Sequence, residues 1–561
     1  GGSLTVLSGN MGNSGYMGST GAATLSTAQL NNSGTIDSAN TLYITATGVD
    51  NRGGQIEAVG NASISVGSGS INNDGSLIRS GATTTLNAAS VINSNTSTTG
   101  TGIEGAGVSL NVNNIDNSAG AIRADKLLDI NSSGVVNNTN GLITSAETVA
   151  IKDPNAPKTL SVINTDGTII AGTDNTIDAK SITGDGKLLS NQDMSIVLTD
   201  DLTNSATIQA ANNLSLSSAG TITNMAKIIA VNANTVTAQS VDNTATAEIS
   251  GTQTTIKAID SVTNRGLVDG TNTLITTQNI NNIGTGRIYG DHLSIGATTL
   301  NNIQETVGST TTAATIAARE RLDIGAGTIN NLEHGTLFSG NTMNIGGALD
   351  VSNNATGQAN TVNNASATIE SIGDMKLSAG QINNTNEHLT TSFPLVSSNY
   401  IQTIQFSNRS SGEHGPGYLG WNLGDIYPGV YDRSNYQFNG IKNISEQDAN
   451  GVWQNLGRIW IENNYTEDIY QARVDTTDPG RITSGGSMSV SGNLFNKDST
   501  LIAGGVYTQT SGTLTNDSTD GTTLVKQKGQ SINRDWYDEG GIFGGGYTRE
   551  DLYTSINKSI S

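Results

Sequence analysis

Residues 71–90, INNDGSLIRSGATTTLNAAS, decide the fold of this chain together with the residues that follow them. The segment begins with an isoleucine and two asparagines and then passes through a turn glycine into short apolar alternations. The next residues, VINSNTSTTG, begin the same pattern again. A chain that restarts one pattern at a fixed interval predicts a repeat architecture rather than a closed globular core.

The start of this unit, an apolar residue followed by two polar ones, recurs along most of the chain, and most steps between starts are 18 to 23 residues. Short runs of apolar and polar alternation inside each unit are typical of β-strands. The density of Asn, Thr, Ser and Gly disfavours helix. Each unit is therefore predicted as strand, turn, strand, turn. The apolar starts are Leu30, Val49, Ile71, Ile92, Ile115, Val136, Ile163, Ile182, Leu202, Ile222, Val241, Val262, Ile280, Leu300, Ile329, Val362 and Ile382.

Similar units of this length place each strand above its counterpart in the preceding unit. One coil cannot bury its own inward side chains, but its neighbours supply both apolar contacts and backbone hydrogen-bond partners. The predicted fold is therefore all-β: a right-handed parallel β-helix of coils of about 20 residues, with an aromatic-rich excursion that does not repeat. Long steps at 136–163, 300–329 and 329–362 predict loops that leave one face of the helix.

The paired asparagines occupy one phase of the coil. Asn tolerates left-handed turn geometry, and its amide can bond to the Asn one coil away. We therefore expect an asparagine ladder at one corner of the helix. The asparagines assigned to it are Asn72, Asn93, Asn137, Asn281, Asn301, Asn330, Asn363 and Asn383.

The repeat is interrupted by a segment of different composition. Between Phe393 and Tyr470 lie 13 of the 24 aromatic residues of the chain. After residue 478 the coil pattern returns, and the last residues resemble neither part. The predicted organisation is a β-helix over 1–387, an aromatic-rich module or insertion over 388–477, resumed coils over 478–525, and a flexible tail or the start of a truncated region over 526–561.

Composition excludes several classes of function. The net charge of −21 provides no positive electrostatic potential that would attract nucleic acid or anionic lipid. The absence of cysteine excludes disulfides, thiolate nucleophiles and Cys-zinc sites, and no stretch has the apolar length of a membrane span.

The sequence predicts no enzyme, metal or cofactor. His292, His334, His388 and His414 are far apart and show no metal-binding spacing. The acids Asp50, Asp116 and Asp242 share the phase of the asparagines but lie about 14 and 29 Å apart at strand spacing. Paired carboxylates of a polysaccharide-cleaving enzyme need about 5 to 10 Å, so we interpret these acids as replacements for Asn.

The unit at 71–90, together with HLTTS at 388–392, DPGRITSGG at 478–486 and KDSTLIAGG at 497–505, resembles the filamentous haemagglutinin repeats of two-partner-secreted exoproteins. The repeats look most like those of the CdiA effectors of contact-dependent growth inhibition. This resemblance implies a secreted filament on the surface of a Gram-negative bacterium, exported by an outer-membrane transporter. It also implies binding to an outer-membrane protein of a neighbouring bacterium. Neither a secretion domain nor a toxin is recognisable, so the chain is expected to be an internal fragment.

The aromatic segment holds the candidate receptor contacts. Tyr418, Trp421, Tyr427 and Tyr431 are spaced by Gly and Pro in a turn-rich stretch, and exposed Tyr and Trp dominate binding hot spots. The same aromatics would also suit the core of a small module. Two other functions stay open: a general adhesin or haemagglutinin that binds a host glycan or protein, and a polysaccharide-active enzyme.

Overall fold

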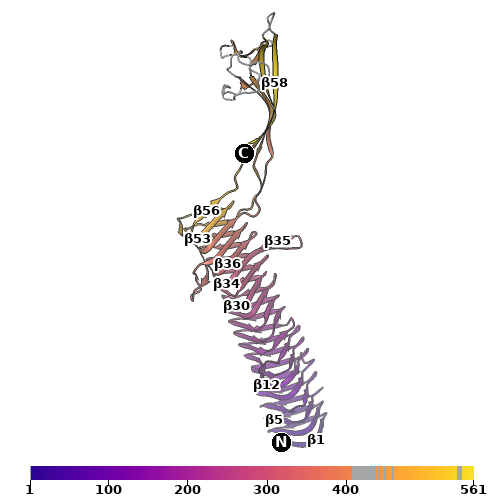
Figure 1. The fold of residues 1–561 in the computed structure, drawn as a ribbon. Helices are drawn as coiled ribbons and strands as arrows, with labels where there is room; N and C mark the ends of the chain where they lie inside the picture. Colours follow the sequence, from indigo (N-terminus) through magenta and orange to yellow (C-terminus); the bar gives the residue numbers. More distant parts are fainter. Residues whose placement is uncertain are drawn as a thin grey trace. The chain divides into compact units, whose positions relative to one another are not determined.

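The computed structural model describes residues 2–406, 431–432, 436–439, 443–447, 450, 452–457, 460–539 and 546–560, and none of these residues is helical. The chain divides into two units. The first comprises Gly1–Glu387 and Pro479–Asp517, and the second comprises His388–Asp478 and Ser518–Ser561. The first unit is a stack of parallel coils, and the stack is visible from β1 (Leu4–Asn13) upward in Figure 1.

Each coil has three short strands that pair in parallel with the strands of the next coil. This confirms the parallel β-helix, but the prediction of two strands per coil was wrong. The third strand is the segment around the paired polar residues, and three residues are too few to show alternation in sequence. One coil is β4 (Thr35–Ser38), β5 (Leu42–Thr45) and β6 (Gly48–Asp50), and the next is β7 (Gln55–Ala58), β8 (Ala62–Ser65) and β9 (Ser70–Asn72).

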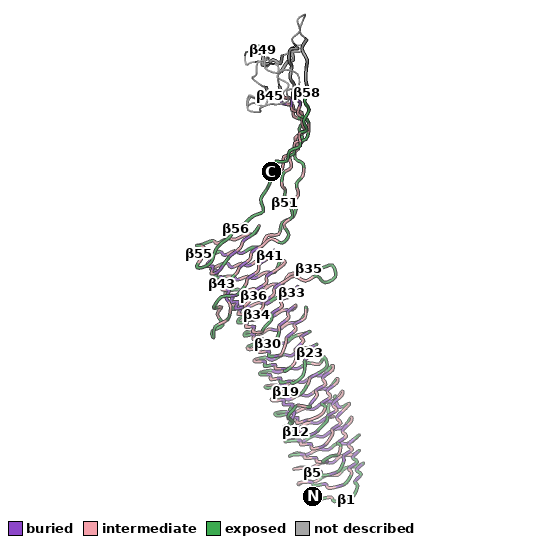
Figure 2. Tube along the Cα trace, in the orientation of Figure 1, coloured by how far each residue is buried: buried purple, intermediate pink, exposed green. Residues whose placement is uncertain are grey.

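The core is a continuous column of Ile, Leu and Val side chains, and burial alternates with exposure along the strands (Figure 2). The predicted apolar starts lie in this column and are buried, with two exceptions. Val91 and Val162 take the inward positions that were assigned to Ile92 and Ile163. Each exception belongs to a pair of adjacent apolar residues, so the sequence does not say which one turns inward.

Buried asparagines form a ladder along one corner of the coils. The amide Nδ2 of each donates to the Oδ1 of the next at 2.6 to 2.9 Å. The same amide usually donates to a backbone carbonyl of the neighbouring coil, as Asn93 does to Ala121 at 2.8 Å. The ladder therefore joins the coils through side chain and backbone together. The buried members are Asn13, Asn32, Asn51, Asn73, Asn93, Asn117, Asn138 and Asn164, and then Asn204, Asn224, Asn243, Asn264, Asn282, Asn302, Asn331, Asn364, Asn384 and Asn496. The ladder ends at Asn516, which is exposed.

Only Asn93 of the eight predicted ladder residues belongs to this buried row. Each of the other seven directly precedes the buried Asn of its own coil and lies on the outward side, because strand alternation turns only the second Asn of each pair inward. Asn281, Asn301, Asn330, Asn363 and Asn383 make an outer row of their own, with Nδ2 to Oδ1 distances of 2.8 to 2.9 Å. Asn72 and Asn137 lie outside that run.

The buried ladder stops once, between Asn164 and Asn204. Gly184 occupies this coil with φ of +97°, and a β-carbon there would come within 2.5 Å of the Thr165 backbone nitrogen. Glycine is the residue that accepts this geometry. The amide of Asn164 donates to the Lys187 carbonyl at 3.2 Å.

The coils resume after a long interruption in sequence and pair in parallel, with one register shift between Ser378 and Gln381. Ile382 of β43 (Met375–Thr385) pairs with Leu494 of β53 (Met488–Lys497). Asn384 Nδ2 donates to Asn496 Oδ1 at 2.6 Å, although 112 residues separate them. The segment His388–Asp478 of the second unit is thus inserted between two consecutive coils, whereas Ser518–Ser561 follow the last coil.

The three long steps contain insertions at two different corners, so the prediction of a single face was wrong. A loop over 153–160 follows the second strand of its coil, as does the hairpin of β39 (Ala348–Leu349) and β40 (Ala355–Thr356). The hairpin made by the end of β34 (Arg287–Val307) and β35 (Thr310–Ala313) instead follows a third strand. Both corners tolerate added residues without loss of stacking.

The second unit is built on an antiparallel sheet. Its strands run in the order β46 (Tyr431–Asp432), β45 (Leu395–Phe406), β50 (Trp460–Gln471), β57 (Thr523–Glu539) and β58 (Gly546–Ile560). Residues 526–561 were predicted as a flexible tail or the start of a truncated region. The described residues among them supply most of β57 and all of β58. β58 pairs along its whole length with Val525–Glu539 of β57.

Removal of one rung of the ladder should destabilise the coils locally. We expect Asn302→Ala to lower the local free energy of opening by about 1–3 kcal/mol, because it leaves buried amide partners unsatisfied. Asn301→Ala, on the outward side of the same pair, is the matched control and should cost less. Hydrogen exchange of the flanking strands measures both, and equal effects would contradict the role assigned to the buried row.

Asp153 organises the loop over 153–160. Its side chain is buried and accepts backbone N–H groups from Asn155 at 2.9 Å, from Leu160 at 2.6 Å and from Thr159. Burial opposes ionisation, but these donors more than offset it, so that the pKa of Asp153 lies below its ordinary value of 3.8.

Loop order should consequently depend on pH with a defined sign. Because the pKa of Asp153 is lower in the folded state, its contribution is complete above pH 3.8 and is lost as the pH falls through the lowered pKa. We expect faster hydrogen exchange at Leu160 at low pH, after correction for the intrinsic rate. In Asp153→Asn this step should be absent, and its persistence would assign it to another group.

Candidate functional site

The predicted receptor contacts lie almost entirely outside the described residues. Tyr418, Trp421 and Tyr427 fall within 407–430, which the structure does not describe. Tyr431 begins β46, whose backbone pairs with Ile404 of β45. These four residues therefore stay predicted contacts. His414 also lies outside the described residues.

The described strands nevertheless define how the segment that carries these residues is attached. Phe406 at the end of β45 is directly opposite Trp460 at the start of β50. The residues between them, 407–459, are thus bracketed by a paired antiparallel ribbon. At the other end of this ribbon, where Leu395 is opposite Tyr470, Lys526 Nζ of β57 lies 4.8 Å from the ring centroid of Tyr470.

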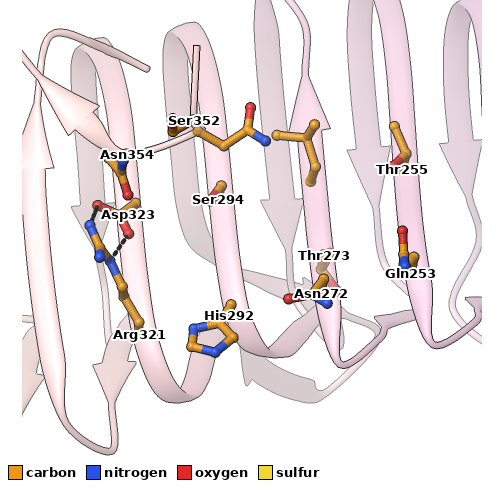
Figure 3. A pocket seen from close by; sticks show the side chains of 12 residues that line it. Gln253, Thr255, Asn272, Thr273, His292, Ser294, Arg321, Asp323, Ser352 and Asn354 are labelled. Atoms are coloured by element: carbon orange, nitrogen blue, oxygen red, sulfur yellow. Dashed lines mark hydrogen bonds and ion pairs between the residues drawn. The ribbon is translucent and has the colours of Figure 1, made fainter. Parts of the chain in front are cut away.

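A hollow of about 370 Å³ lies on the outer side of the solenoid (Figure 3). Its floor is made by the second-strand segments of four consecutive coils. The residues just before β40 form one wall. The floor strands are β30 (Gln253–Asn264), β32 (Asn272–Thr276), β34 and β36 (Thr315–Leu332). Amide and hydroxyl side chains predominate in the lining, among them Gln253, Thr255, Asn272 and Ser294.

Asp323 ties the wall to the floor. Its side chain is only 4% exposed and is paired with Arg321, whose Nε lies 2.5 Å from Asp323 Oδ2. It also accepts the Ala355 backbone N–H at 2.9 Å and the Asn344 amide at 3.1 Å. The hydrogen bond to Asp323 raises the pKa of Arg321, so the guanidinium stays charged and committed to this pair.

Two of the described histidines contact polar side chains of a neighbouring coil. His292 Nε2 lies 3.2 Å from Glu320, and both side chains are more than half exposed. His334 contacts Gln304 at 3.2 Å. Within the described ranges, no three His, Asp or Glu side chains are placed to hold a metal ion.

The acids that were interpreted as replacements for Asn lie in the outward row. Asp116 Oδ1 accepts the Asn137 amide at 3.1 Å, so it does take an asparagine's place there. Asp50 instead pairs with Arg52 at 2.7 Å, and the Arg52 hydrogen bond lowers the pKa of Asp50. Neither acid enters the buried ladder.

Comparison with known families supports the repeat. The Haemagglutinin repeat model matches residues 18–77, 58–104, 103–153, 156–182, 170–224, 226–285 and 463–530, which together are more than half of the chain. The chain belongs to the Haemagglutinin repeat family. No curated protein and no solved structure matches it.

Membership in this family indicates the general type and location of the protein. Haemagglutinin-repeat proteins are filamentous haemagglutinin-type proteins, typically secreted or exposed at the cell surface. In the described part of this family member, no helix is long and apolar enough to cross a membrane. The matched segments cover coils on both sides of the inserted unit, in agreement with the continuous register from Ile382 to Leu494.

Sequence reasoning missed the hollow because its lining comes from four coils and one insertion. The sequence feature that could have indicated it is the long step from Ile329 to Val362, which predicts an insertion next to these coils. The corner from which the insertion leaves, and hence the strands it covers, depends on three-dimensional stacking.

Loss of Asp323 should release the wall of the hollow. In Asp323→Ala the Ala355 N–H and Arg321 lose their buried acceptor. We expect proteolytic cleavage within 347–358 to accelerate several-fold. Glu320→Ala, which removes an exposed acid three residues away, is the control. Cleavage at the same rate in both variants would show that Asp323 does not hold the hairpin.

Proposed function

We propose that this chain is a non-enzymatic, extracellular filament segment of a CdiA-like exoprotein of contact-dependent growth inhibition. It would be exported by an outer-membrane two-partner-secretion transporter and would contribute to binding an outer-membrane protein on a neighbouring bacterium. The observation that carries this proposal is the continuous ladder from Asn384 to Asn496 across an inserted, aromatic-rich unit. A regular filament and a chemically different unit are thereby combined in one chain.

The solenoid suits projection from a surface. Each coil adds about 4.8 Å along the stack, and its stability comes from contacts with adjacent coils, so length can increase without a larger core. The filament needs no disulfide, since cysteine is absent. These properties support a spacer role outside the cell.

The inserted unit suits recognition. Its strands β45 and β50 hold the ends of 407–459 together through the Phe406 and Trp460 pair. Tyr418, Trp421, Tyr427 and Tyr431 belong to this bracketed segment, and Tyr and Trp offer large, rigid contact areas. We therefore retain these four residues as the proposed receptor contacts.

The alternative is a general adhesin that binds a host glycan or protein. It would use the same repeats and differ only in its partner. A polysaccharide-cleaving enzyme is not favoured, because the carboxylates at one phase, such as Asp116 and Asp242, are separated by several coils and cannot act on one bond.

Cell binding separates the two surface functions. Fluorescently labelled chain is applied to Gram-negative cells and to a library of their single outer-membrane-protein deletions. We expect binding to be lost in one deletion strain. Binding that persists in every strain and is abolished by free sugar would instead establish the adhesin.

The paired ribbon permits a sharp test of the contact segment. Replacement of 407–459 by an Asn-Gly turn between Phe406 and Trp460 keeps β45 and β50 paired, and it should weaken cell binding at least about tenfold. The fourfold alanine variant of Tyr418, Trp421, Tyr427 and Tyr431 should do the same. Tyr400→Ala, at a tyrosine that is 66% exposed in β45, is the control. Undiminished binding by both variants would place the contacts elsewhere.

A further inference from the structure

A second hollow lies on the same side of the solenoid as the first. It has a volume of about 450 Å³ and is lined by the second-strand segments of four coils, including Asp193, Asn213 and Thr235. Its strands are β19 (Asn175–Ala179), β22 (Met194–Leu198), β25 (Leu214–Ser218) and β28 (Ala233–Asn243). Because β28 pairs directly with β30, the two hollows occupy consecutive coils.

Both hollows are lined by the same two register rows. In one row, each residue is the register partner of the next residue on the adjacent strand. The row has hydroxyl side chains except at Leu274, which lies between Thr255 and Ser294. The hydroxyl residues are Thr176, Ser195, Ser215, Thr235, Thr255 and Ser294. The other row, two residues earlier on each strand, includes Asn213, Gln253 and Asn272. From Thr176 to Asp323 the rows span seven steps of about 4.8 Å, or about 34 Å.

We propose that these rows form a binding groove for a linear, uncharged polysaccharide that runs along the stack of coils. Hydroxyl and amide groups both donate and accept hydrogen bonds, which matches the hydroxyl-rich surface of a sugar. Hydroxyl or amide side chains recur at most coils of the lining, with Ala233 and Leu274 as exceptions, and a polymer of similar units presents repeated groups to them. This inference adds a ligand to the proposed function and does not depend on it.

The charged residues at the groove favour a neutral ligand over an anionic one, because Arg321 is committed to Asp323 and the lining also carries the acids Asp174 and Asp193. Arg321 is bound to Asp323 at one end. At the other end, Asp193 Oδ1 accepts amide hydrogens from Asn212 at 2.8 Å and from Asn213 at 2.9 Å. A polyanion would in addition meet the repulsion of a net charge of −21.

A protein partner fits these rows less well than a sugar does. Protein contact patches depend on buried aromatic and apolar anchors, whereas the two hollows have no aromatic ring in their lining except the imidazole of His292. Leu274 offers one partly exposed apolar side chain. Affinity for a single sugar should therefore be low and should rise with the number of coils that the polymer covers.

The test uses the full chain with cello-, malto- and chito-oligosaccharides of two to six sugars as probes, measured by isothermal titration calorimetry and saturation-transfer NMR. For at least one series we expect the dissociation constant to fall at least about tenfold from the disaccharide to the hexasaccharide. The double variant Gln253→Ala with Asn272→Ala should weaken hexasaccharide binding about tenfold, the loss expected for one or two hydrogen bonds.

The chain offers a matched control in the same rows. Thr83 and Thr85 occupy the corresponding positions of a coil nearer the N-terminus, outside both hollows. The variant Thr83→Ala with Thr85→Ala should bind the hexasaccharide as the unaltered chain does. No binding in any series, affinity independent of length, or equal loss in both double variants would overturn the proposal. Receptor-dependent cell binding should be unchanged in the Gln253 and Asn272 variant, which separates this test from that of the proposed function.

Discussion

Every coil of the solenoid depends on the next for the hydrogen bonds at its corner. The amide of each buried Asn reaches the following Asn and usually a backbone carbonyl beside it, as Asn282 does with Asn302 at 2.8 Å and with Thr315 at 3.1 Å. A neutral amide can both donate and accept, so one Asn can bond to the Asn before it and to the Asn after it. Carboxylates stacked about 4.8 Å apart would repel one another. The corner thus favours asparagine over an acid, and one coil has Gly184 in this position.

Each coil depends on the register of its neighbour and not on being next to it in sequence. This explains how the stack accommodates the second unit. The coil that contains Asn384 needs only a following coil of the correct phase, and the coil that contains Asn496 supplies it after 112 residues. The chain can therefore leave the stack and return with Ile382 opposite Leu494. Insertions at the corners follow the same rule on a smaller scale. They add chemistry at the surface, such as the wall held by Asp323, while the core column stays unbroken.

The repeat, the parallel stacking and the return of the coils after the aromatic segment could be predicted from the sequence, because inward residues such as Ile71 recur at a nearly constant step. Which of two adjacent asparagines turns inward could not, since a difference of one residue is decided by strand alternation within the stack. For the same reason Ile92 was assigned the place of Val91. The hollows were beyond sequence reasoning, because their lining comes from residues about twenty positions apart. The proposed contacts around Trp421 rest on composition and spacing.

The most direct test of this account is the energetic coupling between Asn384 and Asn496. A double-mutant cycle with Asn384→Ala and Asn496→Ala, read by hydrogen exchange of the two flanking coils, isolates their interaction. If coil-to-coil pairing sustains the fold, the coupling should be at least about 0.5 kcal/mol. Strictly additive effects would mean that these residues do not meet, and would contradict a solenoid that continues across the inserted unit.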